Sequence, residues 1–144
     1  MKPRILFIED ESEYFEPLVD ALEKKYLLKE VGNLAQAIKA LSEEEFDLLL
    51  VDIMLPQGES CPMQVDNRRS GLHLVRWIRR KEVVSAVQPK CLPEVPILAI
   101  TAVSDVSALE ELKSLGVDLV AKPFSLKVVL NQVAAVLRDL PHGN

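Results

Sequence analysis

Acidic and hydrogen-bonding side chains follow four apolar runs of this 144-residue chain. Glu9 and Asp10 come after "RILFI", and Asp52 interrupts the apolar stretch "FDLLLVDIMLP". Thr101 follows "VPILAI", and Lys122 follows "DLVA". Burying an ionised carboxylate is costly unless donors or cations meet it, so Asp52 needs such partners.

The chemistry that these residues can perform follows from their charges, provided that the apolar runs bring them together. Three neighbouring carboxylates repel one another, and a hard cation that prefers oxygen ligands relieves the repulsion. Mg²⁺ binds one or two carboxylates together with water and phosphate oxygens. The sequence therefore predicts that Mg²⁺ and Lys122 together neutralise Asp52.

The apolar runs predict a sheet of five strands. The runs 47–51 and 95–100 are nearly continuous instead of alternating, which is typical of central parallel strands covered on both faces. Helical patterns separate the runs, so we expect an α/β domain with a mainly parallel sheet. Ligands of such sheets collect beyond the carboxyl ends of the strands. The predicted strands are 4–8, 27–31, 47–51, 95–100 and 118–121.

Each predicted strand is followed by a helical stripe of apolar residues. The first helix has Ser12 as a candidate N-cap and places Pro17 in its first turn. Its apolar stripe consists of Phe15, Leu18, Val19, Leu22 and Tyr26. The second begins near Asn33, and Gly116 is expected to end the fourth. The other stripes cover residues 72–78 and 126–137.

Composition indicates one soluble globular domain. Apolar residues make up 49% of the chain and charged residues 27%, and the net charge of −5 disfavours direct binding to nucleic acid. The sequence shows no signal peptide and no membrane-spanning apolar run, so we expect a cytoplasmic protein. Cys61 and Cys91 have no metal-binding spacing and are predicted to be passive thiols.

The motifs "ILFIEDE", "LLLVDIMLP", "PILAITA" and "VAKPF" resemble the receiver domain of bacterial two-component response regulators, over about residues 3–139. Each motif is weak by itself, but the four occur in order at the ends of the expected strands. The resemblance implies a flavodoxin-like (βα)5 fold, a doubly wound sandwich with a five-stranded parallel sheet and helices on both faces. We expect residues 1–140 to form this domain and 141–144 to be a tail.

The resemblance also implies a role for each site residue. Asp52 would accept a phosphoryl group, Thr101 would sense it, and Lys122, before a commonly cis Pro123, would pair with it. The donor would be a sensor histidine kinase or phosphotransfer protein, and the output a downstream protein target. The chain would thus be a signalling phosphoacceptor and not an enzyme. The implied Mg²⁺ ligands are Glu9, Asp10, Asp52 and the backbone carbonyl of Met54.

Two other functions remain open at this stage. A receiver-like adaptor would bind partners without being phosphorylated. A phosphohydrolase with an aspartyl nucleophile would carry a second acid two positions after Asp52, where this chain has Met54. Met54 therefore argues against the hydrolase.

The sequence departs from the family pattern in two places. Leu119 stands where the family usually has a switch aromatic, and an insertion at 57–70 separates Pro56 from the third helix. We expect the insertion to be a mobile polar loop whose arginines, Arg68 and Arg69, reach toward the phosphoryl group or a kinase.

The lifetime of the signal is a further expectation. By the same resemblance, the side chains of Met54 and Val103 border the approach of the water that removes the phosphoryl group. Neither can hold a water by hydrogen bonding, so we expect a long-lived phosphoaspartate. His73 is predicted to be a packing or surface histidine and not a metal ligand, Trp77 is predicted to serve packing, and His142 lies in the tail.

Overall fold

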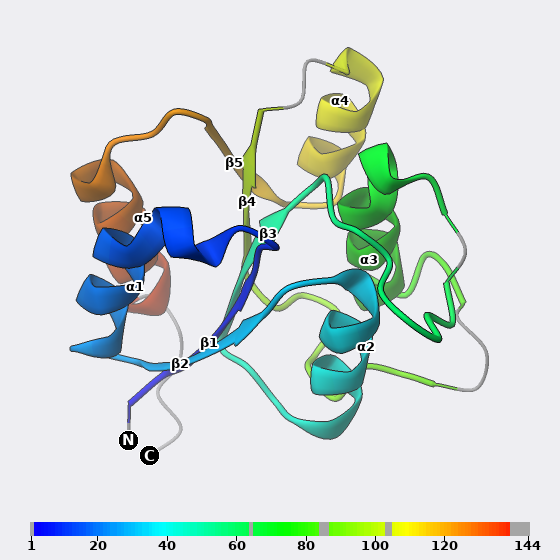
Figure 1. Cartoon of the computed structure of the whole chain (residues 1–144), viewed down its shortest axis with the longest axis horizontal. Helices are drawn as coiled ribbons and strands as arrows, with labels where there is room; N and C mark the ends of the chain where they lie inside the picture. Colours follow the sequence, from blue (N-terminus) through cyan, green and yellow to red (C-terminus); the bar gives the residue numbers. More distant parts are fainter. Residues whose placement is uncertain (1, 64, 84–86, 103–104, 139–144) are drawn as a thin grey trace.

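The computed structural model describes residues 2–63, 65–83, 87–102 and 105–138. Its five strands form one parallel sheet in the order β2-β1-β3-β4-β5 (Figure 1). This topology confirms the predicted flavodoxin-like fold. The strands are β1 (Arg4–Ile8), β2 (Leu27–Val31), β3 (Leu48–Asp52), β4 (Ile97–Thr101) and β5 (Asp118–Ala121).

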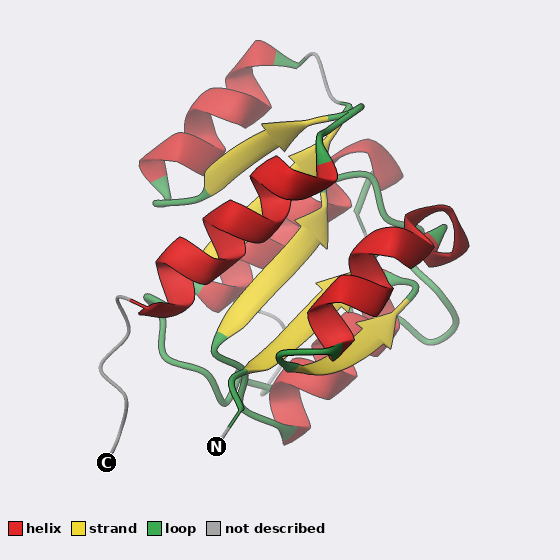
Figure 2. Cartoon of the chain, turned by 90° about the vertical axis from the view of Figure 1, so that its left-hand side faces the viewer, coloured by secondary structure: helices red, strands yellow, loops and turns green. Residues whose placement is uncertain are grey.

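Helices cover both faces of the sheet. On one face α1 (Glu16–Glu23) lies beside α5 (Leu126–Arg138), as Figure 2 shows. The opposite face carries α2 (Leu34–Glu43), α3 (Ser70–Ile78) and α4 (Val106–Ser114) (Figure 1). Each set of helices packs on its own cluster of buried side chains from the sheet. The molecule is therefore a three-layer sandwich.

The burial of the strands follows their apolar patterns. Every residue of β3 and β4 is buried, which confirms that these continuous runs form central strands. The edge strands β2 and β5 are more exposed and carry charged residues. Asp52, the last residue of β3, therefore emerges from the most deeply buried part of the sheet.

The predicted helix boundaries are correct except at the first helix. Ser12 is wrong as the N-cap, because it begins a short 3₁₀ helix, η1 (Ser12–Phe15), and Phe15 caps α1 without a side-chain hydrogen bond. Pro17 lies in the first turn of α1, where its missing N–H costs nothing. Asn33 caps α2 by accepting a hydrogen bond from the Gln36 N–H at 2.8 Å.

Gly116 closes α4 as the sequence predicts. The residue has a φ of +75°, in the left-handed region that glycine adopts without steric cost. Its N–H donates to the Lys113 carbonyl at 3.0 Å, and the next N–H, of Val117, donates to Leu112 at 3.1 Å. The turn leads directly into β5.

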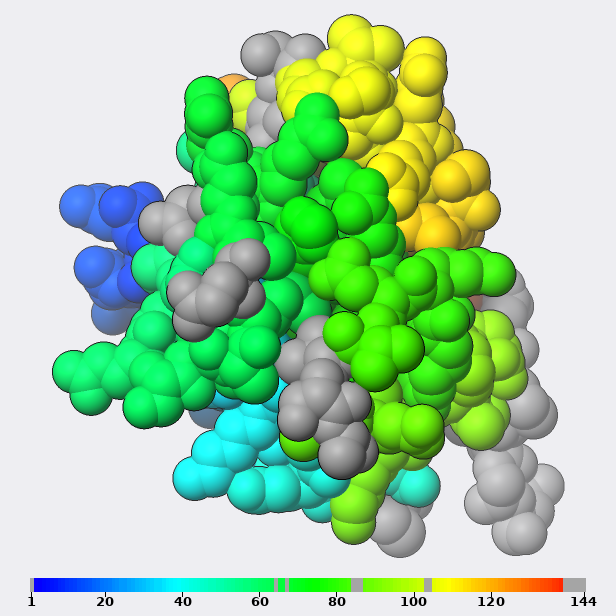
Figure 3. Space-filling view, turned by 90° about the vertical axis from the view of Figure 1, so that its right-hand side faces the viewer, coloured from blue at the N-terminus to red at the C-terminus, as the bar shows by residue number. Residues whose placement is uncertain are grey.

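The segment 57–70 differs from the expected polar surface loop, because the structure buries its apolar side chains. Cys61 and Met63 are 6% and 4% exposed, and both belong to the core cluster beneath α2 and α3. Val65 packs against the same cluster. Figure 3 shows the described parts of residues 57–83 in green, between α2 in cyan and α4 in yellow. The insertion thus extends the hydrophobic core on this face.

The start of this segment also closes the amino end of α2. The first N–H groups of a helix lack partners within it. Here the Pro56 carbonyl accepts from Leu34 and the Gln57 carbonyl accepts from Ala35, each at 2.8 Å. Gly58, with a φ of +83°, lies against the Asn33 side chain, where a Cβ atom would be 2.5 Å from Asn33 Oδ1. The segment is therefore tied to α2 by its backbone as well as by its apolar side chains.

Several other predicted features can be placed. Cys61 and Cys91 are both buried and form no disulfide among the described residues, and Trp77 is a core residue of α3. No helix in the described ranges has the length and apolar character needed to span a membrane. Val103, His142 and the tail 141–144 lie outside the described residues.

Candidate functional site

The predicted acidic residues meet at the carboxyl ends of the central strands. Ile8 in β1 pairs with Val51 in β3, so Glu9 and Asp52, the residues that follow them, leave the sheet at the same level. With Asp10, these carboxylates bring one oxygen each within 4.8 Å of one another. The parallel register thus assembles the cluster that the sequence predicts.

Lys122 extends from the end of β5 into this cluster. Its Nζ lies 3.2 Å from Asp52 Oδ2 and 3.3 Å from Glu9 Oε2. The backbone N–H of Lys122 donates to the Thr101 carbonyl at 2.9 Å, which continues the β4–β5 pairing by one residue. The following Lys122–Pro123 peptide bond is cis, as the resemblance implies.

The carboxylates of the cluster are buried to different extents. Glu9 is 3% exposed and Asp52 is 6% exposed, whereas Asp10 is exposed. Burial raises the pKa of Glu9 to about 8, and the neighbouring Asp52 carboxylate adds to this effect. Burial lowers the pKa of Lys122, but Asp52 and Glu9 outweigh it and raise that pKa above its usual value. The site therefore favours a further positive charge.

The donor set fits a hard cation such as Mg²⁺. Carboxylate oxygens are the ligands that Mg²⁺ prefers, and with Mg–O bonds of about 2.1 Å two ligand oxygens lie up to about 4.2 Å apart. One oxygen each of Glu9, Asp10 and Asp52 lies within 4.8 Å of the other two, which is close to this distance between ligand oxygens. A cation there would also counter the burial and the Asp52 charge, which together raise the Glu9 pKa. The Met54 N–H donates to Asp52 Oδ1 at 3.0 Å, which places the Met54 backbone beside the cluster.

Thr101 and Leu119 lie on one side of the cluster. Thr101 is 4% exposed and ends β4 beside β3, with Ile100 opposite Asp52. Leu119 of β5 is half-buried and lines an open groove of about 430 Å³ that also reaches Thr101. Leu119 stands at the position where the receiver pattern usually has a larger, aromatic side chain.

The loop after Asp52 is supported by two residues at the start of α3 that the sequence patterns do not single out. Ser70 is fully buried, and its Oγ accepts from the Leu55 N–H at 2.8 Å and donates to the Leu55 carbonyl at 2.7 Å. Gly71 allows a close approach, because a Cβ atom there would lie 2.5 Å from Ile53 Cα and 2.8 Å from the Asp52 carbonyl oxygen. The sequence signal for this support is a serine–glycine pair at the start of a helix.

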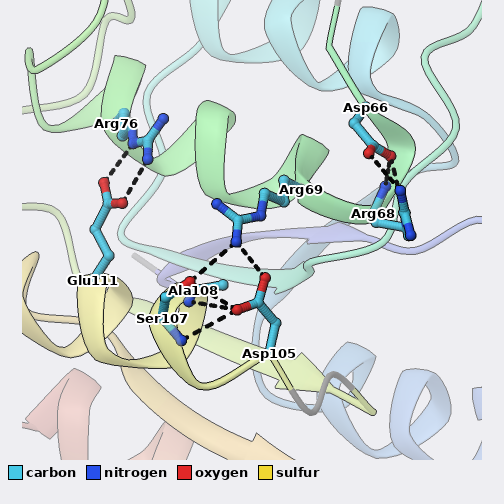
Figure 4. Close-up of polar contacts among 8 residues, drawn as sticks. All are labelled: Asp66, Arg68, Arg69, Arg76, Asp105, Ser107, Ala108 and Glu111. Carbon is cyan, nitrogen blue, oxygen red and sulfur yellow. Dashed lines mark hydrogen bonds and ion pairs between the residues drawn. The ribbon is translucent and has the colours of Figure 1, made fainter.

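The two arginines of the insertion do not contact the acidic cluster in this structure. Arg69 Nη2 donates to Asp105 Oδ2 at 2.5 Å and to Ser107 Oγ at 3.0 Å, at the start of α4 (Figure 4). Arg68 pairs with Asp66 within its own segment at 3.2 Å. Arg69 thus links the insertion to α4, and Arg68 serves the local turn.

The protein is an α/β protein with a doubly wound parallel sheet. Acidic side chains and a lysine lie beyond the carboxyl ends of its strands, which is where proteins of this class bind charged ligands. The family model of the response regulator receiver domain matches residues 5–134, and the chain belongs to this family.

Individual relatives agree with this assignment. The chain is 31% identical over 136 residues to the transcriptional regulatory protein GltR of Pseudomonas aeruginosa, covering 93% of this chain and 48% of that protein. The chain spans about half the length, or less, of the curated relatives it matches.

Solved structures show the same fold. The non-phosphorylated HemR receiver domain from Leptospira biflexa superposes with a TM-score of 0.74 at 28% identity, over 99% of both chains. The receiver domain of the sensor histidine kinase PA1611 from Pseudomonas aeruginosa, solved with a magnesium ion coordinated in its active-site cleft, gives 0.66 at 23% identity, over 96% of this chain and all of that one.

Proposed function

We propose that this chain is a phospho-accepting receiver that takes a phosphoryl group onto Asp52 from a histidine kinase or phosphotransfer protein. One observation carries the proposal: the Asp52 carboxylate ends a central strand, 3.2 Å from Lys122 Nζ and beside Glu9 and Asp10. The proposed setting is the cytoplasm, and the proposed output is a changed surface that a downstream protein recognises.

The chemistry assigns a task to each side chain. An Asp52 oxygen attacks phosphorus in line, the P–N bond of the donor phosphohistidine breaks, and its electron pair returns to the imidazole. Lys122 pairs with the transferred group, and the Thr101 hydroxyl donates a hydrogen bond to it. Glu9, Asp10, Asp52 and the Met54 carbonyl would hold Mg²⁺, which would supply charge compensation. The reaction depends on positioning and electrostatics more than on covalent catalysis by the protein.

Slow loss of the phosphoryl group belongs to the proposal. Met54 is 46% exposed beside the cluster, and a thioether gives an attacking water no strong hydrogen bond. In-line attack by water therefore lacks orientation from this side chain. The decay of labelled protein, compared with that of Met54→Asn, tests this part.

Labelling with a small acyl phosphate tests the function. The wild-type chain with Mg²⁺ should incorporate phosphate that hydroxylamine removes, and Asp52→Asn should abolish incorporation. Asp20→Asn, the same change at an exposed position of α1, is the matched control and should label normally. A wild-type chain that stays unlabelled by acyl phosphates and by phosphorylated kinases would instead indicate a receiver-like adaptor.

A further inference from the structure

We propose that Phe15 is a positioning residue of this site, whose ring face holds the Lys122 ammonium against Asp52 and Glu9. The inference rests on the proposed function of Asp52. The sequence patterns predict Phe15 only as an apolar residue of a helical stripe, and the structure places it at the end of η1.

Three contacts surround the Lys122 ammonium. Its Nζ lies 3.2 Å from Asp52 Oδ2, 3.3 Å from Glu9 Oε2 and 5.2 Å from the centroid of the Phe15 ring. A cation within about 6 Å of a ring face is attracted by the negative potential of the π system. A lysine side chain has many rotamers, and fixing it costs entropy. A third contact therefore favours the position from which Lys122 meets both carboxylates.

The Phe15 ring is itself held from two sides. Phe7 of β1, which is 1% exposed, meets it edge-on, with centroids 5.9 Å apart and planes at 80°. Phe124, two residues after Lys122, stacks on it at 5.6 Å with planes at 3°. The ring thus connects the strand that carries Glu9 to the loop that carries Lys122. Such a fixed ring can define where the ammonium lies.

An aromatic ring suits this position better than another acid would. A fourth carboxylate would add repulsion to a cluster in which burial already disfavours the charge of Glu9. It would also oppose an incoming phosphoryl group. The ring attracts the ammonium without a net charge, so this contact persists when Asp52 becomes phosphorylated. Phe15 therefore keeps Lys122 positioned while its anionic partners change.

Packing offers a simpler explanation of Phe15, and the chain provides a matched control against it. Phe15 and Phe124 both pack on the core cluster between the sheet and α1 and α5. At the opposite end of the sheet the Arg4 guanidinium lies 5.2 Å from the ring centroid of Phe46, which is 6% exposed. Phe46→Leu therefore removes a cation–π contact of the same length, and core packing, away from the site.

The first test compares rates of Asp52 phosphorylation by an acyl phosphate at saturating Mg²⁺. Phe15→Leu keeps an apolar side chain but lacks a π face, and we expect it to react about fivefold more slowly. Phe15→Trp, which restores a π face, should recover most of the rate, and Phe46→Leu should match the wild type. The proposal is overturned if Phe15→Leu reacts at the wild-type rate, or if Phe15→Trp is as slow as Phe15→Leu.

A second test follows the contact itself and does not depend on phosphorylation. Nuclear Overhauser effects should connect the ε-protons of Lys122 to the Phe15 ring in the wild-type chain. Phe15→Leu should shift these lysine resonances because the ring current is lost, and Phe46→Leu should leave them unchanged. Absence of the Overhauser effects would overturn the proposal even if Phe15→Leu does not fold. Conversely, a wild-type chain with these effects but no phosphorylation would refute the proposed function and leave the contact established.

Discussion

Two regions of the molecule differ in how their carboxylates are neutralised. One is the acidic cluster at the strand ends, and the other is the face formed by segment 57–70, α3 and α4, which we call the α3–α4 face. At the strand ends, buried carboxylates outnumber the lysine that pairs with them, and the pKa of Glu9 is raised to about 8. The positions of Asp52 and Glu9 follow from the sheet register, so the fold holds them together despite their repulsion.

On the α3–α4 face Asp66, Asp105 and Glu111 each pair with an arginine. Arg76 of α3 forms a two-pronged ion pair with Glu111 of α4, and Arg69 pairs with Asp105 (Figure 4). The hydrogen bond from Arg76 holds the pKa of Glu111 below its usual value. The pKa of Asp105 is lowered mainly by its hydrogen bond from Ser107, with contributions from the Ala108 N–H and Arg69.

This difference separates a binding site from a structural interface. Carboxylates whose charge the protein does not fully neutralise repel one another. A cation that binds between them relieves this repulsion, and the relief favours its binding. Carboxylates that are already paired gain little from a ligand and mainly connect elements. We therefore expect changes at the strand ends to alter binding, and changes on the α3–α4 face to alter stability.

The largest effect on stability should come from the apolar part of segment 57–70. Met63→Ala removes a side chain that is 4% exposed, and we expect the free energy of unfolding to fall by about 3 kcal/mol. Chemical denaturation measures the change, and Mg²⁺ affinity should stay at the wild-type value. Glu59→Ala, at an exposed position of the same segment, is the control. A neutral Met63→Ala would show that this segment is a surface loop after all.

The next effect should be on Mg²⁺ binding. Asp10→Asn removes a proposed carboxylate ligand, so calorimetric titration should show Mg²⁺ affinity reduced by about tenfold or more. Asp66→Asn makes the same change on segment 57–70, where Asp66 pairs with Arg68, and should leave the affinity unchanged. Equal losses in the two variants would mean that Mg²⁺ responds to overall charge instead of to this cluster.

The sequence predicts one of these regions much better than the other. Continuous apolar runs that end in Glu9, Asp52 and Lys122 determine both the strands and the register, so the cluster can be predicted from local patterns. The burial of Cys61 and Met63 cannot be predicted in this way, because two apolar residues among polar ones show no periodicity. The residues that they contact are distant in the sequence.

The contact between the Phe15 ring and Lys122 cannot be predicted from the sequence for a similar reason. Phe15 is 107 residues away from Lys122 in sequence, and nothing in its local pattern distinguishes a ring on a lysine from a ring in the core. Ser12 illustrates the reverse case, in which a favourable local signal for an N-cap is overridden when residues 12–15 form a 3₁₀ turn that places Phe15 near Lys122.

Changing pH should affect the two regions in opposite directions. The pKa of Glu9 is raised from 4.5 to about 8, so the folded protein binds this proton more tightly than the unfolded chain. The resulting stability is complete below the unfolded pKa and is lost as pH rises through about 8. The lowered pKa of Glu111 has the opposite sign, because its stability is present above the unfolded pKa and is lost as pH falls.

At the proposed site Mg²⁺ would compete with the Glu9 proton, so stabilisation by Mg²⁺ should grow with pH. Thermal unfolding with and without Mg²⁺, from about pH 6 to about pH 9, measures this effect. Glu9→Gln cannot lose the proton and should flatten the dependence, whereas Glu111→Gln should leave it unchanged. A Mg²⁺ effect that is independent of pH in the wild type would contradict the raised pKa of Glu9.

The smallest effect should come from the ion pair between Arg76 and Glu111. Their side chains are 25% and 35% exposed, and ion pairs open to solvent contribute about 0.2 to 1 kcal/mol because water screens the charges and fixing the side chains costs entropy. A double-mutant cycle of Arg76→Gln and Glu111→Gln should therefore give a coupling energy of about 0.5 kcal/mol that decreases with added salt. Denaturant unfolding of the four proteins provides the measurement. Mg²⁺ affinity should be the same in all four, since neither residue belongs to the acidic cluster. A coupling energy as large as the loss of stability from Met63→Ala would contradict the view that this ion pair is a weak surface contact. A change in Mg²⁺ affinity would show that the α3–α4 face is energetically coupled to the acidic cluster.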